Sequence, residues 1–305
     1  MINELISTEK DYLESLEIVR DHFILPLKQN GVLAEDEMEI IFINWNDLWL
    51  CTNRLYKSLK IRRKMTIKQD INIGDILCEN VSLSFFFLFS FLFFLLFFQF
   101  SQMSAYIRFC SSQLTAAALL QKLVEIKPGF DDFLRQCQSQ VKGMPLSFFL
   151  LKPVKRVMDY PLLVEKILKF SSGHPDFFYL QKSLKLAKEL CEQVNEGTRH
   201  KENTERLEWL QIHVDKNSEL TLDEKLTFNS MTNLMGPRKF LHFGFLKKAK
   251  SSKELVVFLF NDFLLLTYPN YSVAPQFSFD KHHDLKLKLY KKPLFLNEIE
   301  IIGKN

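Results

Sequence analysis

LSFFLLKPVKRVMDYPLLV, residues 146–164, says more about the fold than any other stretch of this 305-residue chain. Apolar residues recur at helical spacing at Leu150, Val154, Val157 and, just beyond the stretch, Leu168. Such spacing places them on one side of a helix, so that side is suited to burial. The stretch is therefore predicted to be an amphipathic helix of a larger helical assembly.

The same stretch also carries charged residues and two prolines. The charged side chains share a second face of the helix, at Lys152, Lys155, Arg156 and Asp159. Pro153 and Pro161 fall inside the predicted helix, and each removes a backbone hydrogen bond and should bend or break it locally. A kinked helix with a charged stripe is too specific a pattern for a helix that only packs in a hydrophobic core.

This pattern resembles the signature segment of the Dbl-homology (DH) family, the guanine-nucleotide exchange factors for Rho GTPases. The family segment contains K-P-x-Q-R-[IV]-x-x-Y-P-L-L, and residues 152–163 read KPVKRVMDYPLL. Lys155 stands where the family usually has Gln, a departure at one polar position. The resemblance implies a helical bundle that binds a small GTPase.

Composition bounds the class of protein. A chain of 305 residues has room for about two domains, and 47% hydrophobic with 25% charged residues is ordinary globular composition. The five cysteines fall at no metal or disulfide spacing, which favours reduced thiols in a cytosolic protein. The first ten residues, MINELISTEK, are polar and acidic and lack the apolar core of a cleavable signal.

The charge balance and the pattern of apolar residues change after Leu220. The net charge is +4, yet residues 231–305 hold 12 Lys or Arg against 6 Asp or Glu, so the remainder sums to −2. Before this change, apolar periodicity predicts helices. They are expected from Leu5 to Pro26, over 35–59, from about Met103, over 129–137, through the signature stretch, and from Phe177 to beyond Glu205. Together they predict a helical bundle.

Short β-rich runs follow Leu220. ELVVFLFNDFLLLTY (residues 254–268) and the alternating Leu285–Leu289 are separated from their neighbours by turn signals. A short antiparallel sheet after a helical bundle resembles the pleckstrin-homology (PH) domain that usually follows DH. The predicted fold class is therefore an all-α DH helical bundle followed by a β-rich, incomplete PH barrel.

The predicted domains are DH over residues 1–206, a linker over 207–235 and PH over 236–305. The PH domain is expected to be truncated, because the chain stops at Asn305 before the helix that closes the family's barrel. The chain also begins inside the first DH helix, so we expect a fragment or a partial gene model.

An apolar insert at residues 81–99 interrupts the predicted DH domain. Val81–Phe100 has no charge and ten Phe, which meets the length criterion for a membrane span. A span here would put the first helix and the signature helix on opposite sides of a bilayer, whereas the DH fold that the resemblance implies needs them side by side. Ser82–Phe98 contains only Phe, Leu and Ser, which pyrimidine-only codons can specify. We favour a translated intron; a genuine apolar insertion and a membrane element stay open.

Further segments resemble the DH–PH unit of the intersectin family, endocytic scaffolds whose exchange module acts on the Rho-family member that controls filopodial actin. The matching segments outside residues 81–99 include IIFINWNDL (40–48), YIRFCSSQL (106–114), ELCEQVNEGTRHKEN (189–203), FNSMTNLMGPRKFLH (228–242) and KELVVFLFNDFLLLT (253–267). The resemblance implies a cytoplasmic protein that is peripheral at the plasma membrane or at endocytic sites.

The resemblance also assigns GTPase-binding residues. Glu9, in a T-E-x-x-Y-x-x-x-L pattern, matches the glutamate that engages switch I. Lys152 and Asn195 match residues that contact switch II. The alternative for Lys152 is a stem packed on the bundle with its charged head in water, and the alternative for Asn195 is a capping or solvated residue. Arg156 either touches the GTPase or braces the bundle, while Tyr160 and Leu162–Leu163 are expected to pack.

The basic C-terminal part suggests a second partner. Lysines bracket the first two predicted PH strands, at Lys239, Lys247, Lys248, Lys250 and Lys253. The usual basic phosphoinositide motif is missing, so weak attraction to an anionic phosphoinositide membrane surface is predicted, with a solvated face equally open. Arginine and aromatic residues do not cluster with these lysines, which disfavours nucleic acid as a partner.

No segment has the nucleotide-hydrolysis, dinucleotide, zinc-protease or serine-hydrolase motifs. We therefore predict a regulatory exchange factor that performs no covalent chemistry and has no cofactor and no metal site. A GTPase that holds GDP with a nanomolar dissociation constant has a binding free energy of about 12 kcal/mol. To accelerate GDP release, the factor must bind the nucleotide-free GTPase more tightly than the GDP-bound form. The alternative is a non-catalytic, membrane-associated scaffold with a disrupted DH surface.

Overall fold

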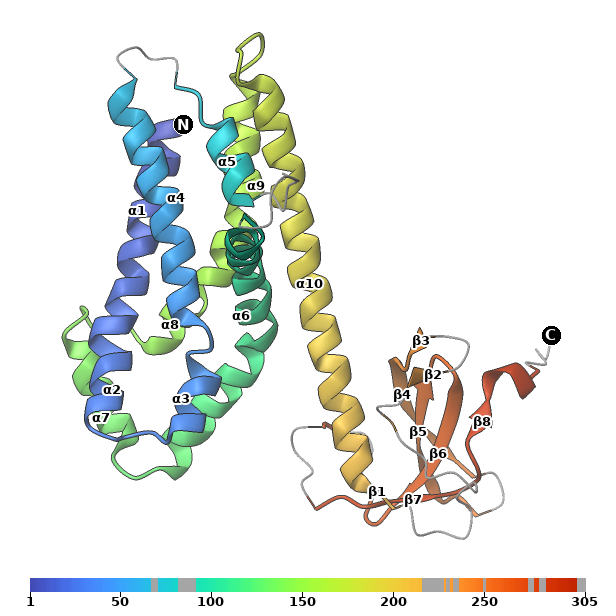
Figure 1. Cartoon of the computed structure of the whole chain (residues 1–305). Helices are drawn as coiled ribbons and strands as arrows, with labels where there is room; N and C mark the ends of the chain where they lie inside the picture. Colours follow the sequence, from blue (N-terminus) through green and yellow to red (C-terminus); the bar gives the residue numbers. More distant parts are fainter. Residues whose placement is uncertain are drawn as a thin grey trace. The chain divides into compact units, whose positions relative to one another are not determined.

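The computed structural model divides the chain into two compact units, Met1–Arg199 and His200–Asn305 (Figure 1). Within residues 79–103 only backbone is described, and then only in helical segments. The residues that the structure describes are 1–66, 71–81, 92–215, 228, 231–232, 236–248, 251–273, 277–279 and 284–300.

The first unit is helical, as predicted. Its elements are α1 (Ile2–Val19), α2 (Leu25–Gln29), α3 (Glu35–Ile41), α4 (Trp45–Met65), α5 (Gly74–Val81), α6 (Leu92–Ile126), α7 (Phe130–Ser139), α8 (Leu146–Leu150), α9 (Lys152–Lys169) and the first part of α10 (Phe177–His213). A π-helical turn at Arg20–Ile24 joins α1 to α2. The long helices lie side by side, with both α1 and α6 packed against α4 and α9 (Figure 1).

Two predicted helices are each broken into two. The signature stretch forms α8 and α9, and Pro153 lies in the first turn of α9, where its missing N–H needs no partner. Pro161 lies inside α9, which continues through it. The helix predicted over 35–59 breaks at Asn44, which has a left-handed φ of 42° and donates its side-chain amide to the Ala105 carbonyl at 3.0 Å.

Two apolar clusters fill the helical unit. The larger joins buried residues of α1, α4, α6 and α9, including Leu16, Leu48, Phe109 and Val157. The other lies around α5 and the ends of α1, α4 and α9, and includes Leu5. The helical stripe predicted for the first helix is buried, which confirms that its face points into the core.

The second unit combines the end of α10 with strands. They are β1 (Val214–Asp215), β2 (Met231–Thr232), β3 (Gly236–Pro237), β4 (Phe240–Lys247), β5 (Glu254–Phe260), β6 (Phe263–Pro269), β7 (Leu287–Leu289) and β8 (Leu294–Phe295). The main sheet has the order β1-β7-β6-β5-β4, and β8 pairs with β6. Within the described residues this order has two ends, β1 and β4, so the sheet is not closed.

The sheet is antiparallel except for the β1–β7 pair. Leu287 and Leu289 of β7 are buried while Lys288 is exposed, which confirms the alternation seen in the sequence. Leu207 and Leu210 of α10 join the apolar core beneath the strands. The linker expected over 207–235 therefore starts inside α10, which continues to His213.

Most of the apolar insert predicted at 81–99 lies outside the described residues. Residues 82–91 are not described, and Leu92 onward is seen only as the backbone start of α6. Among the helices of the described residues, none is long and apolar enough to cross a membrane. The three interpretations of this insert therefore stay predictions.

Asp176 fixes the start of α5 and gives a test of the fold. Asp176 is 3% exposed, and its carboxylate accepts hydrogen bonds from the backbone N–H groups of Ile73 and Gly74 at 2.7 and 2.9 Å. Asp176→Ala would leave both donors buried without that acceptor, so we expect a loss of about 2–4 kcal/mol in unfolding free energy. Denaturant unfolding followed by helical circular dichroism measures it. Glu192→Ala, a substitution of an exposed residue on α10, is the control. If both substitutions lower the unfolding free energy equally, Asp176 does not have the proposed role at the start of α5.

Candidate functional site

The predicted GTPase-binding residues lie on three neighbouring helices. Glu9 lies on α1, Lys152 and Arg156 on α9, and Asn195 on α10. Helix α9 packs against α1, and it also contacts α10 through the Cys191 thiol, which donates to the Val157 carbonyl at 3.4 Å. The fold thus gathers residues that are up to 186 positions apart in sequence on adjacent elements.

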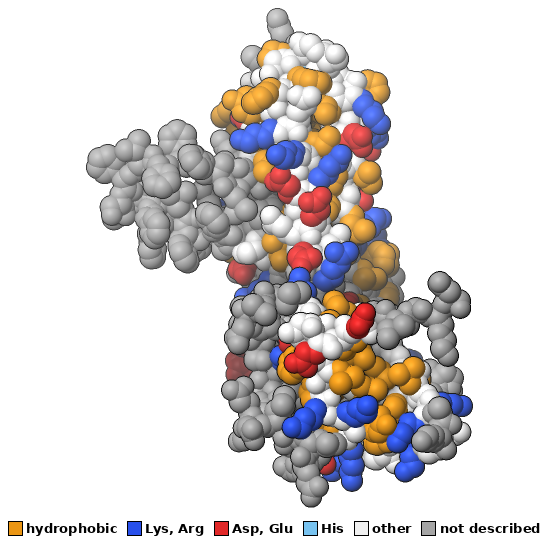
Figure 2. Space-filling view, turned by 90° about the vertical axis from the view of Figure 1, so that its right-hand side faces the viewer, with side chains coloured by type: hydrophobic (Ala, Val, Ile, Leu, Met, Phe, Trp, Pro, Cys, Tyr) orange, Lys and Arg blue, Asp and Glu red, His pale blue; other side chains and the backbone are white. Residues whose placement is uncertain are grey.

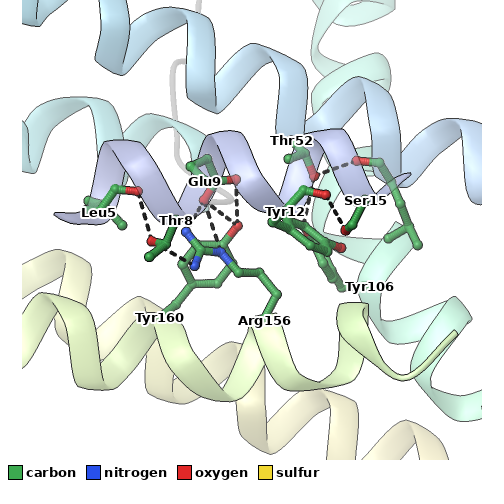
Figure 3. A network of polar contacts seen from close by, with 10 residues as sticks. Leu5, Thr8, Glu9, Tyr12, Ser15, Thr52, Tyr106, Arg156 and Tyr160 are labelled. Atoms are coloured by element: carbon green, nitrogen blue, oxygen red, sulfur yellow. Dashed lines mark hydrogen bonds and ion pairs between the residues drawn. The ribbon is translucent and has the colours of Figure 1, made fainter. Parts of the chain in front are cut away.

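Glu9 is fully buried at the α1–α9 contact (Figure 3). The guanidinium of Arg156 donates to its Oε2 from Nε at 3.1 Å and from Nη2. The Tyr160 hydroxyl donates to Oε1 at 3.1 Å, and Nη1 of Arg156 donates to the Thr8 hydroxyl at 3.2 Å. We call Glu9, Arg156 and Tyr160 the α1–α9 brace.

Electrostatics explain why the brace is a charged pair. Burial raises the pKa of Glu9, and the charge and hydrogen bonds of Arg156 oppose that rise. For Arg156, burial acts to lower the pKa, but Tyr160 and Glu9 outweigh burial and the pKa is raised. Two guanidinium N–H groups donate to one oxygen of the Glu9 carboxyl group, the arrangement of a charge-assisted pair. We therefore assign an ion pair.

In the free chain the Arg156 side chain is directed toward α1. This side chain is 5% exposed and donates hydrogen bonds to Glu9 and Thr8 of α1, as expected for a residue that braces the bundle. The ring of Tyr160 lies 4.8 Å from the guanidinium carbon. Tyr160 is buried, as expected. Direct contact of Glu9 with a GTPase stays a prediction, and it requires the brace to open.

Lys152 is half-buried at the start of α9. Its Nζ lies 5.1 Å from the ring centroid of Phe148 and 5.3 Å from that of Phe149, within the range of cation–π attraction. Burial lowers the pKa of Lys152, helped by the charge of Lys155 and opposed by that of Asp11. The ammonium is thus held near the surface by aromatic rings.

Helix α9 and the residue before it also carry an exposed apolar stripe, which the sequence pattern did not predict. Leu151, Met158 and Leu162 are 53%, 60% and 64% exposed, and we call them the α9 stripe. The expectation that Leu162 packs was wrong; Leu163 does pack against the core. Positions 151, 158 and 162 lie on the helix side opposite Val157 and Tyr160. That spacing was visible in the sequence, but apolar residues were assigned to the core by default.

Asn195 is exposed on α10. It follows Cys191 by one helical turn, and Cys191 touches α9. This position places Asn195 beside α9. The three-helix face therefore offers apolar, cationic and amide groups, a combination suited to binding a protein surface.

The predicted membrane-binding lysines do not form one cluster. Lys248 and Lys253 lie at one end of β4–β5, with Nζ atoms 4.6 and 5.9 Å from the rings of Tyr290 and Tyr268. Lys247 pairs in register with Glu254 at this end. Lys239 precedes β4 at the other end, roughly 25–30 Å away along the strand. Lys250 lies outside the described residues.

The hydroxyls of Tyr290 and Tyr268 hydrogen-bond the Lys248 ammonium and raise its pKa. Lys291 lies 5.8 Å from the Tyr290 ring and extends this cluster. On the face of the second unit that Figure 2 presents, Lys and Arg side chains border the lower part of a group of hydrophobic side chains, and Asp or Glu side chains lie above it. Among the described residues, no group of His, Cys, Asp and Glu is arranged to hold a metal ion.

Comparison with known families agrees with this architecture. Residues 1–195 match the RhoGEF domain and residues 218–305 match a pleckstrin homology domain. The chain therefore belongs to the RhoGEF domain family, with a PH domain after the helical domain. This finding confirms the DH–PH resemblance.

Comparison with individual proteins agrees with this family assignment. The chain is 45% identical over 306 residues to intersectin-1 of Homo sapiens, covering 98% of this chain and 16% of that protein. It is 43% identical over 315 residues to intersectin-2 of Mus musculus, covering 98% and 17%. The chain thus spans about one sixth of the length of these relatives.

Solved structures agree on the fold. The linker-DH/PH domains of p115-RhoGEF superpose with a TM-score of 0.75 at 22% identity, covering 96% of this chain and 81% of that one. The PDZ-RhoGEF DH/PH domains, solved in complex with RhoA, give 0.73 at 22% identity, covering 97% and 79%.

The brace makes a pH-dependent prediction. Arg156→Ala leaves the Glu9 carboxyl buried without its cation, and we expect a loss of about 3–5 kcal/mol in unfolding free energy near neutral pH. With the opposing charge gone, burial raises the pKa of Glu9 further. A raised native pKa gives stability that is present at low pH and lost as pH rises through that value. The loss should therefore be smaller at pH 5 than at pH 7.5.

Denaturant unfolding of the substituted and unsubstituted chains at both pH values measures this difference. The control is the double substitution Glu9→Gln with Arg156→Ala, which has no carboxyl to titrate and should lose the pH dependence. An Arg156→Ala loss that is the same at both pH values would contradict the brace.

Proposed function

We propose that this chain promotes GDP release from a Rho-family small GTPase. The observation that carries the proposal is the α9 stripe, an exposed apolar row beside Lys152 on the signature helix of a RhoGEF-family chain. Three large apolar side chains in one row are costly to leave in water and suit a protein partner. The PDZ-RhoGEF DH/PH domains have been solved with RhoA, which supports this class of partner.

The proposed mechanism uses binding energy rather than covalent chemistry. A face that fits the nucleotide-free GTPase better than the GDP-bound form shifts the population toward nucleotide release. In this scheme the α9 stripe supplies apolar contact, and Lys152 and Asn195 supply polar contacts to the switch regions. Glu9 is buried, so we place its contribution in holding α1 against α9.

We also propose a finer assignment from the intersectin similarity. The preferred GTPase is the Rho-family member that controls filopodial actin, and the setting is endocytosis and actin regulation. The 45% identity to intersectin-1 over the whole unit supports this choice.

Release of a fluorescent GDP analogue from purified Rho-family GTPases tests the exchange proposal. We expect Leu162→Asp, which puts a charge into the apolar contact, to slow release at least about tenfold, and Lys152→Ala to slow it less. Ile61→Asp is the control, since Ile61 is a comparably exposed residue of α4 (53%). Equal rates for Leu162→Asp and the unsubstituted chain would rule out the α9 stripe as the contact.

The apolar insert needs its own comparison. The same assay with residues 81–99 deleted shows whether the insert is dispensable. A folded chain that fails to accelerate release, with and without the insert, would favour the scaffold alternative.

For the second unit we propose weak attraction to anionic membranes through Lys248, Lys253 and Lys291. Their ammonium groups gather around two tyrosine rings at one end of the sheet. A lysine near an anionic surface contributes about 1 kcal/mol, and salt screens the attraction. The chain would then act as a peripheral membrane protein.

Sedimentation with phosphatidylserine- and phosphoinositide-containing vesicles tests this attraction. Lys248→Ala combined with Lys253→Ala should weaken binding about 30-fold at low salt, because two such contributions are lost. Lys239→Ala, at the far end of β4, is the control and should cost less than either single change in the cluster. If Lys239→Ala weakens binding as much as the double change, the cluster is not the membrane site.

A further inference from the structure

A groove on the helical unit lies outside the brace. It has a volume of about 680 Å³ and is formed by α6, α7 and α8, within the size range of ligand-binding sites. Its apolar lining includes Ala117 and Leu120 of α6, Leu134 of α7 and Leu150 of α8. We call it the α6–α8 groove.

The groove is open to apolar side chains of a partner. Val124 and Leu151 line it and are 37% and 53% exposed. Ala117, a small residue on α6, leaves room between its neighbours for an incoming side chain. A helix that inserts apolar side chains at every third or fourth position is the usual occupant of such a surface.

The charged residues that line the groove indicate which kind of amphipathic helix would bind there. They are Glu125 and Asp131, and the lining of the groove includes no Lys or Arg. Glu125 accepts a hydrogen bond from Gln121 at 3.3 Å. The Asp131 side chain is 43% exposed and is paired with Arg135 one turn along α7. Both carboxylates therefore remain near solvent, where a partner's cation can reach them.

We propose that the α6–α8 groove is a docking site for a basic amphipathic helix of a partner protein. Apolar side chains of that helix fill the space beside Ala117, and its Lys or Arg residues meet Glu125 and Asp131. Charge complementarity argues for this occupant, because an acidic helix would place like charges against the same two carboxylates.

The groove is also connected to the exchange surface. Leu151 lines the groove and belongs to the α9 stripe, so an occupant that covers Leu151 competes with a GTPase there. Docking should therefore slow GDP release. This regulatory half rests on the proposed function, whereas docking itself does not.

A matched pair of peptides tests docking to the full chain. Each is a labelled helical peptide of about 15 residues with Leu at i, i+3, i+4 and i+7 spacing; one carries Lys at its polar positions and the other Glu. Fluorescence anisotropy should show the Lys peptide binding at least tenfold more tightly. Glu125→Gln with Asp131→Asn should remove most of that preference.

Two phenylalanine substitutions separate the groove from general charge attraction. Ala117→Phe fills the groove without changing charge and should weaken the Lys peptide at least tenfold. Ala118→Phe is the matched control, because Ala118 is the exposed neighbour that does not line the groove, and it should leave binding unchanged. Equal binding to both variants, equal binding of both peptides, or no binding at all overturns the docking site.

GDP release measured with saturating Lys peptide tests the regulatory half. Slower release by the unsubstituted chain, with no slowing for Ala117→Phe, supports it. Unchanged release by a chain that is active without peptide overturns it. A chain inactive without peptide instead contradicts the proposed function, and the docking site is then decided by anisotropy alone.

Discussion

The buried ion pair between Glu9 and Arg156 is the constraint on which the exposed surface depends. The two residues are 147 positions apart in sequence and are 0% and 5% exposed. An unpaired charge at such a site costs several kcal/mol, so α1 and α9 must meet where both partners are satisfied. Fixing Arg156 toward α1 fixes the rotation of α9 about its own axis. The α9 stripe is the side that this rotation leaves in water.

Helix α10 imposes a second constraint, since it serves two apolar cores. Leu190 and Val194 belong to the core of the helical unit, and Leu207 and Leu210 belong to the core of the sheet-containing unit. A break in the helix between these pairs would expose backbone groups that are now paired within the helix. Asn195 directly follows Val194, so packing of Val194 in the core of the helical unit fixes the position of Asn195.

Much of the fold was predictable because its signals are local. The apolar spacing of the helices, the signature stretch and the alternation in β7 each depend on short segments, and the structure confirms them. The break at Asn44 was not predictable, because it depends on a hydrogen bond to Ala105, 61 positions away. The separation of Lys239 from Lys248 also required strand register, since both flank the same strand, β4.

Burial of polar and exposure of apolar residues were the least predictable features of the site. Glu9 is a charged residue of a helix and Leu162 an apolar one, so average preferences place the first outside and the second inside. The structure reverses both, and one cause accounts for both reversals. Glu9 can be buried because α9 provides Arg156 and Tyr160 as donors, and the rotation of α9 that provides them turns Leu162 outward.

An ionic brace also does something that an apolar contact of equal size would not do. Apolar side chains can slide past one another by a fraction of a turn at small cost, because their attraction has no direction. The fork of Arg156 and the hydroxyl of Tyr160 both require the Glu9 oxygens at hydrogen-bond distance, so a shift of α9 along α1 leaves a buried donor or a buried charge without its partner. The exchange activity proposed above depends on distinguishing two forms of one GTPase, a difference of shape rather than of composition. A surface that must distinguish shapes has to be held rigid itself, and a directional buried pair directly behind that surface provides the rigidity.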